Sequence, residues 1–177
     1  DRRHDEMSDR FGVIRIEPHG RGNTSYLGMG DDDVLNVIKL AKAAFHVDDK
    51  KVYLTGESMG GGGTWHVGTR HPDLFAAIAP VYGGWDYHTT TPDSLLDNMN
   101  LKEEYLHETQ SSFAQAEALM TLPAFVIHGD ADQSVAVKYS HYAVPMLERW
   151  GYPIYYHEFP DYGHERIPYD NQLMEFF

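Results

Sequence analysis

Four consecutive glycines shortly after a strand-like run constrain the fold of this chain more than any other feature of its sequence. Residues 56–63 read GESMGGGG, and they follow the β-rich run KVYLT at residues 51–55. Glycine loses more backbone freedom on folding than any other residue and costs roughly 1 kcal/mol relative to alanine in a helix interior. The run therefore predicts a place where the backbone comes unusually close to another part of the protein.

Short apolar runs rich in β-branched and aromatic residues alternate with segments of helical periodicity. The predicted strands are residues 11–16, 51–55, 75–81, 124–128 and 154–159. Such alternation is typical of the α/β class, with a mostly parallel sheet flanked by helices. No internal repeat or low-complexity segment interrupts it, so we expect a single domain over residues 1–177.

Two helices stand out between these strands. The first begins at the acidic run 31–33, where carboxylates suit the helix dipole, and its predicted inner face is Val34, Ile38, Ala41 and Phe45. The second covers about 137–150, is kinked or delayed by Pro145 and stops at Gly151. Its predicted inner face is Tyr139, Ala143, Met146, Leu147 and Trp150. A further stretch, about 89–122, is helix-prone and predicts a helical insertion, either a fixed cap or a mobile lid.

Charge and composition exclude several classes of function. The formal net charge is −13 and the basic residues are scattered, which argues against a nucleic-acid partner. No apolar run approaches 18 residues, so we expect no membrane partner. The chain has no cysteine, and its eleven histidines show no H-E-x-x-H or other zinc-type spacing. We therefore predict no metal site and no cofactor.

The glycine run acquires a chemical meaning from its context. A strand, the pattern G-x-S-x-G at residues 56–60 and a helical segment follow one another, which is the arrangement of a nucleophile elbow. Such a turn lifts the Ser58 hydroxyl clear of the sheet. We expect glycine at positions 56 and 60, Gly56 and Gly60, because the turning chain leaves no room there for side chains. The backbone N–H of Met59 would face a developing oxyanion. The alternative is a glycine-rich turn with an incidental serine.

A nucleophilic serine needs a base and an orienting carboxylate, in the chain order serine, acid, histidine. The acid is predicted on the loop after the strand 124–128, where Asp132 is preferred and Asp130 is expected to brace the turn. Histidine follows the strand 154–159 as His164, with Asp161 nearby as a third candidate acid. Both loops come at strand carboxyl ends, where open α/β sheets place their sites.

Three motifs resemble those of α/β-hydrolase serine esterases, which include polyhydroxybutyrate-depolymerase-like and feruloyl-esterase-like enzymes. They are KKVYLTGESMGGGGTWHVGTRHPDLFAAIAPVYGG, HGDADQSVAV and PDYGHE. The acid-loop motif is also similar to that of prolyl-oligopeptidase-type peptidases. The resemblance covers the chain from about residue 11 and implies an α/β-hydrolase fold with Ser58 as nucleophile, His164 as base, Asp132 as acid and Met59 as an oxyanion donor.

The same resemblance implies that strands before residue 11 are missing from this chain. In the family's strand order a further strand lies between those expected at 11–16 and 51–55, and a loop before residue 11 supplies the second oxyanion donor. We therefore expect an upstream part of the protein to complete the sheet. The loop 19–22, HGRG, is considered both as a substitute for that donor and as part of the site's rim.

Aromatic residues near the expected site are candidates for a substrate pocket. Trp85 and Tyr87 follow the strand 75–81, where they would either stack on a substrate group or pack in the core, and Tyr26 is a weaker candidate. The resulting prediction is a serine esterase that cleaves small or polymer-linked carboxylic esters. The alternatives are a prolyl-oligopeptidase-type peptidase, which commonly has an aromatic residue where Met59 stands, and a non-catalytic binding domain.

Overall fold

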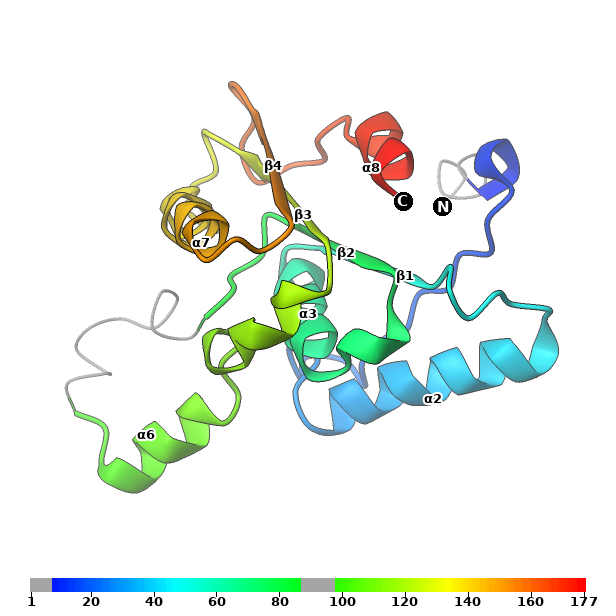
Figure 1. Ribbon diagram of the computed structural model, residues 1–177. Helices are drawn as coiled ribbons and strands as arrows, with labels where there is room; N and C mark the ends of the chain where they lie inside the picture. Colours follow the sequence, from blue (N-terminus) through cyan, green and yellow to red (C-terminus); the bar gives the residue numbers. More distant parts are fainter. Residues whose placement is uncertain (1–7, 87–97) are drawn as a thin grey trace.

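The computed structural model describes residues 8–86 and 98–177, and a four-stranded parallel sheet forms its centre (Figure 1). The strands lie in chain order: β1 (Tyr53–Glu57), β2 (Ala77–Val81), β3 (Ala124–Gly129) and β4 (Ile154–Phe159). Each strand is parallel to its neighbour, so all four carboxyl ends meet at one edge of the sheet. The predicted α/β class with a parallel sheet flanked by helices is confirmed.

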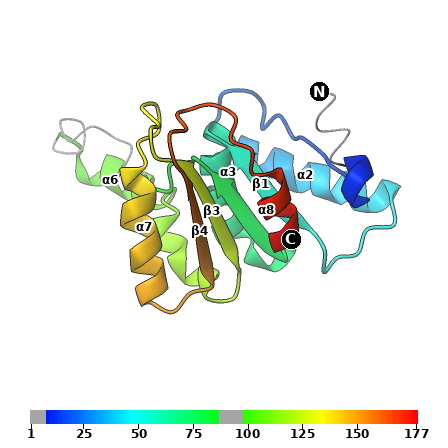
Figure 2. The same cartoon turned by 90° about the horizontal axis from the view of Figure 1, so that it is seen from above.

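Helices cover both faces of the sheet. Figures 1 and 2 show α2 (Met29–Ala44) and α3 (Met59–Arg70) on one side and α8 (Asp170–Phe176) on the other. On the first side, α7 (Lys138–Arg149) and the 3-10 helices η1 (Pro72–Leu74) and η2 (Phe113–Met120) complete the layer. Helix α6 (Leu101–Glu108) buries none of its residues.

Two apolar clusters result from the alternation of side chains along the strands. The larger cluster joins Ile78 and Val126 of the sheet to Trp65 of α3 and Leu147 of α7. The second lies on the other face, and its members include Ala79, Val81, Phe125, Ile127, Phe159 and Leu173. Because β2 and β3 are buried on both faces, they read as continuous apolar runs in the sequence.

The strand predicted at residues 11–16 is wrong. Phe11 ends a short helical turn and residues 13–16 are irregular, with Val13, Ile14 and Ile16 exposed. The only strand that pairs with β1 in the described residues is β2. A β-rich sequence becomes a strand only when a neighbour accepts its backbone hydrogen bonds. No described strand stands on the side of β1 away from β2 to do so.

The inner faces predicted for the two long helices are right in their middles and wrong at their ends. In α2, Val34 is buried and Ile38 packs against the core, whereas Phe45 is 52% exposed. In α7, the inner face is built around Ala143 and Leu147, whereas Trp150 is 46% exposed. Phe45 and Trp150 each lie one residue beyond their helix, where the helical periodicity no longer directs them to the sheet.

Candidate active site

Ser58 stands on a sharp turn between β1 and α3. Its backbone has φ 55° and ψ −115°, a conformation that residues other than glycine rarely adopt. The turn is held at both ends, because the Ser58 N–H donates to the Val81 carbonyl at 3.0 Å and the Gly62 N–H donates to the Ser58 carbonyl at 3.0 Å. The strained turn presents the Ser58 side chain at the carboxyl edge of the sheet.

Glycines allow this turn and bring α3 against the end of β2. A Cβ at Gly56 would lie 2.4 Å from the Gly60 carbonyl oxygen, and one at Gly61 would lie 2.5 Å from the Val81 carbonyl oxygen. One at Gly83 would lie 2.2 Å from the Gly61 carbonyl carbon. The expectation for Gly60 is wrong, because a Cβ there would meet nothing within 4 Å. Gly60 crowds Gly56 with its own backbone and is not crowded in return.

Asp132 is fixed on the loop after β3 by its own backbone surroundings. One of its carboxylate oxygens, Oδ1, accepts the N–H groups of Ser134 at 2.8 Å and Val135 at 2.9 Å. The other, Oδ2, lies 2.8 Å from the Nδ1 atom of His164, and the residue is 3% exposed. Burial alone would raise the pKa of Asp132, but the hydrogen bonds from His164, Val135 and Ser134 outweigh it and hold the pKa below its ordinary value.

Among the three candidate acids, Asp132 is the one hydrogen-bonded to His164. Asp130 instead accepts the backbone N–H of Asp161 at 2.7 Å, which braces the turn and ties it to the histidine loop. The two loops also meet where the Ala131 N–H donates to the Tyr162 carbonyl at 2.9 Å. This contact between the loops brings His164 within reach of Asp132.

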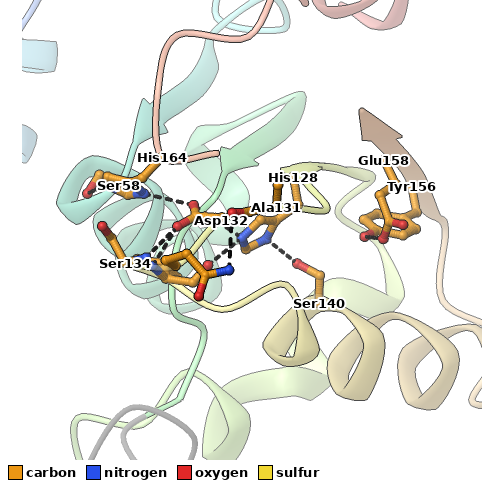
Figure 3. A network of polar contacts seen from close by, with 11 residues as sticks. Ser58, His128, Ala131, Asp132, Ser134, Ser140, Tyr156, Glu158 and His164 are labelled. Carbon is orange, nitrogen blue, oxygen red and sulfur yellow. Dashed lines mark hydrogen bonds and ion pairs between the residues drawn. The ribbon is translucent and has the colours of Figure 1, made fainter. Parts of the chain in front are cut away.

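Ser58, His164 and Asp132 form one continuous row of hydrogen bonds (Figure 3). The Nε2 atom of His164 lies 2.8 Å from the Ser58 hydroxyl, and its Nδ1 atom faces Asp132. With the proton on Nδ1, the imidazole donates to the carboxylate and accepts from the serine hydroxyl. That tautomer is the one a general base requires, because its free lone pair points at the serine.

His128 supports the loop that carries Asp132. It is fully buried, its Nε2 donates to the Val135 carbonyl at 2.8 Å and its Nδ1 lies 2.7 Å from the Ser140 hydroxyl (Figure 3). Burial lowers the pKa of His128 despite the opposing effects of the Val135 carbonyl and of Asp132. The side chain is therefore a neutral imidazole that holds the loop carrying Asp132.

The remaining predicted site residues are placed as follows. Met59 is the first residue of α3, where backbone N–H groups have no intrahelical acceptor, so its N–H is available at the serine turn. Trp85 is 2% exposed and packs between Trp65 and Phe113, so in this structure it presents no surface to a substrate. Tyr26 is half-buried with its ring against Gly63 of α3, and Tyr87 lies outside the described residues.

Loop 19–22 packs against Tyr26 and α2. A Cβ at Gly20 would lie 2.7 Å from the Tyr26 ring, and the Gly20 carbonyl accepts a hydrogen bond from the Thr24 hydroxyl at 2.6 Å.

Metal-ligating side chains do not gather anywhere in residues 8–86 and 98–177 in a group of three or more.

Sequence reasoning missed Tyr82, Glu57 and Tyr169. Tyr82 follows β2 directly, and its ring packs edge-on against the His164 ring with centroids 5.1 Å apart. The Tyr169 hydroxyl donates to the Glu57 carboxylate at 2.5 Å. The available signals were the position of Tyr82 at a strand carboxyl end and the position of Glu57 between Gly56 and the serine.

Comparison with known proteins identifies the family. The model of the prolyl oligopeptidase family matches residues 10–176. The chain belongs to this family. Its fold is of the α/β-hydrolase type, and its predicted resemblance to α/β-hydrolase serine esterases is confirmed. Within the described residues of this family member, no helix has both the length and the apolar character needed to cross a bilayer.

The chain is similar to two curated proteins and to two solved structures. It is 30% identical over 115 residues to an uncharacterized secreted protein of Arthroderma benhamiae, and 33% identical over 81 residues to the bifunctional acetylxylan esterase/xylanase XynS20E of Neocallimastix patriciarum. These matches cover 63% and 44% of this chain but 12% of each relative, so the chain spans about an eighth of their length.

The structural neighbours include an esterase and a peptidase. A thermostable esterase superposes with a TM-score of 0.55 at 26% identity, over 72% of this chain and 27% of that chain. The acylaminoacyl peptidase of Pyrococcus horikoshii superposes with a TM-score of 0.65 at 21% identity, over 84% of this chain and 27% of that chain. The second likeness shows the shared fold alone.

Proposed function

We propose that this chain carries the catalytic centre of a serine carboxylic ester hydrolase that works through an acyl-enzyme intermediate. The observation that supports it is the hydrogen-bonded row in which Ser58, His164 and Asp132 are joined by two 2.8 Å contacts. Its order is the one that a nucleophile, a base and an orienting acid require. Its position at the carboxyl ends of β1, β3 and β4 is where open parallel sheets place their sites.

In the first half of the reaction, the Ser58 Oγ attacks the ester carbonyl carbon while its proton passes to Nε2 of His164. Asp132 holds the Nδ1 proton and stabilises the imidazolium cation. The carbonyl oxygen becomes an oxyanion that the Met59 N–H stabilises. A donor of this kind is typically worth about 10²–10³ in rate. The tetrahedral intermediate expels the alcohol, which takes the proton from His164, and leaves an acyl ester on Ser58.

In the second half, a water molecule replaces the alcohol. His164 accepts a proton from the water, the resulting hydroxide attacks the acyl carbonyl, and the same oxyanion donor serves again. Collapse of this intermediate returns the proton to Ser58 and releases the carboxylic acid. The sum is hydrolysis of one ester into an alcohol and an acid, with the enzyme restored.

Ester substrates are favoured over peptides by the esterase among the structural neighbours and by the acetylxylan esterase among the relatives. The latter makes acetyl esters on a polysaccharide the first polymer-linked substrate to assay. The description of the family itself supports a second candidate, a prolyl-oligopeptidase-type peptidase. The two differ in the leaving group, since an amide nitrogen is a poorer leaving group than an alcohol.

We also propose that β1 receives a further strand along its free edge in the whole protein, and that this part supplies a second oxyanion donor. The support is that β2 is the only strand pairing with β1 in residues 8–86 and 98–177. Amide hydrogen exchange of Tyr53–Glu57 in the whole protein tests this. Slow exchange of the outward-facing amides is expected, and exchange at the rate of an open edge would contradict it.

Matched ester and amide substrates test the proposed reaction. The purified protein is assayed with p-nitrophenyl acetate, acetylated xylan and a prolyl p-nitroanilide. We expect it to hydrolyse the two esters faster than the amide, and we expect Ser58→Ala to hydrolyse none of them. Preference for the prolyl amide would establish the peptidase instead. Turnover of neither, with no covalent adduct at Ser58, would indicate a binding domain.

A further inference from the structure

The residue just before the serine, Glu57, directs its carboxylate to two tyrosine hydroxyls. The Tyr169 hydroxyl donates to Oε1 of Glu57 at 2.5 Å, and the Tyr82 hydroxyl also interacts with this carboxylate. Both tyrosines are buried. The pKa of each tyrosine is raised, first by burial and then by the Glu57 carboxylate, so both hydroxyls remain donors at neutral pH.

Tyr82 connects Glu57 to the imidazole, because its hydroxyl interacts with the Glu57 carboxylate and its ring contacts His164. Its backbone N–H donates to the Ile127 carbonyl at 2.7 Å and its φ is 35°, so the residue is held in an uncommon conformation at the end of β2. Its ring then meets the His164 ring edge-on, with centroids 5.1 Å apart and planes inclined at 65°. The Tyr82 ring therefore packs against the imidazole and limits its movement on that side.

Tyr169 fixes the other side of the histidine loop. It lies five residues after His164, immediately before α8, and between them Ile167 is fully buried. The charge of Arg166 acts on the hydroxyls of both Tyr82 and Tyr169 and places a cation near the same network. Since Glu57 adjoins Ser58 in the chain, its bond to Tyr169 ties the histidine loop to the serine turn.

We infer that Glu57 is a positioning residue: through Tyr82 and Tyr169 it holds the His164 imidazole at the distance and angle that Ser58 requires. This role rests on the proposed function of the Ser58, His164 and Asp132 row. Glu57 touches none of the reacting atoms. It acts by fixing the ring and the loop, and a displacement of about 1 Å in such a group can lower a rate by about 100-fold.

Three variants separate this role from a purely structural one. Glu57→Leu and Tyr169→Phe remove the carboxylate and the hydroxyl, whereas Glu57→Gln keeps an acceptor oxygen for Tyr169. The matched control is Tyr156→Phe, which removes another tyrosine–glutamate hydrogen bond, that of Tyr156 with Glu158 on β4, away from the row (Figure 3).

The first measurement is the second-order rate constant of fluorophosphonate labelling, with the melting temperature of each variant. We expect about 10- to 100-fold slower labelling in Glu57→Leu and Tyr169→Phe. Glu57→Gln should stay within about threefold of the unmodified chain, because the acceptor survives. The double variant of Glu57→Leu with Tyr169→Phe should be no slower than the slower single variant, because both break one network. Tyr156→Phe should label normally even where it loses stability.

The second measurement is proton NMR of the low-field Nδ1 proton of His164, which needs no catalysis. It should shift or broaden in Glu57→Leu and Tyr169→Phe and stay unchanged in Tyr156→Phe. Tyr169→Phe is the milder change and decides the question if Glu57→Leu does not fold. An unchanged resonance and labelling rate in folded Tyr169→Phe would overturn the inference. An unmodified chain that does not label would refute the proposed function, while the NMR comparison would still decide the role of Glu57.

Discussion

The loop that carries Asp132 and the segment 11–16 differ in their hydrogen bonding and in the burial of their side chains. In the loop, one carboxylate accepts two backbone N–H groups and a histidine, and the neighbouring backbone is bonded to the histidine loop. In the segment, Ile14 is 57% exposed and no ladder bonds form. A loop that supplies its own hydrogen bonds is determined by its local sequence. A strand is determined only together with its neighbour.

The largest effect should follow from breaking the acid loop. Asp132→Asn replaces the carboxylate that holds the Nδ1 proton of His164 and is expected to lower kcat/KM for ester hydrolysis by about 10³- to 10⁴-fold. Asp130→Asn keeps an acceptor for the Asp161 N–H and should cost less than about tenfold. Steady-state kinetics on both variants decides the assignment. A larger loss in Asp130→Asn would reverse it.

The contrast in burial should appear directly in stability. Ile127→Ala opens a cavity at a position of 0% exposure in β3, next to the acid loop, and should lower the unfolding free energy by about 3 kcal/mol. Ile14→Ala removes an exposed side chain and should change it by less than about 0.5 kcal/mol. Urea denaturation of both variants measures the difference. A comparable loss in Ile14→Ala would mean that this segment is packed in solution.

Two glycines, one at the start of α3 and one just after β2, provide a finer test. Gly83→Ala would force a Cβ against the Gly61 backbone and should cost about 3 kcal/mol of unfolding free energy. Gly60→Ala meets no atom and should stay within about 1 kcal/mol of the unmodified chain. Thermal or urea unfolding of this pair checks the close approach of α3 to the end of β2. Equal stability of the two variants would disprove that approach.

The smallest expected effect is a pH dependence of stability that arises from His128, which packs against the loop carrying Asp132. Burial lowers the pKa of His128 below its ordinary 6.5, and that of His66 is lowered in the same way. The unfolded chain then binds more protons than the folded one, so this contribution to stability is full above pH 6.5 and is lost as the pH falls below it. Melting temperatures measured from pH 7.5 to 5 should fall less steeply in His128→Gln than in the control His46→Gln. Equal slopes would contradict this account.

The serine turn and the two loops were predictable because their determinants are local. The strand before Gly56, the glycines and the positions of Asp132 and His164 after strands are all visible in the sequence. The packing alternative for Trp85 was visible as well, although not decidable, because stacking on a substrate and packing in a core use the same apolar side chain. Burial between Trp65 and Phe113 distinguishes the two only in three dimensions.

The features that escaped prediction depend on contacts between distant segments. The Glu57–Tyr169 bond joins residues 112 positions apart, and no local pattern marks such a pair. Gly60 has room for a side chain because no other atoms lie within 4 Å of a Cβ there, which only the folded turn reveals. The failure at residues 11–16 has the same origin, since β-propensity describes a fit to a neighbouring strand.

Labelling with a fluorophosphonate, followed by peptide mapping of the adduct, shows which residue is the nucleophile and whether His164 activates it. We expect a single adduct on Ser58, formed rapidly in the unmodified protein, absent in Ser58→Ala and at least about 100-fold slower in His164→Ala, because the base has been removed. An adduct on another residue, or labelling of Ser58 at the same rate without His164, would contradict it.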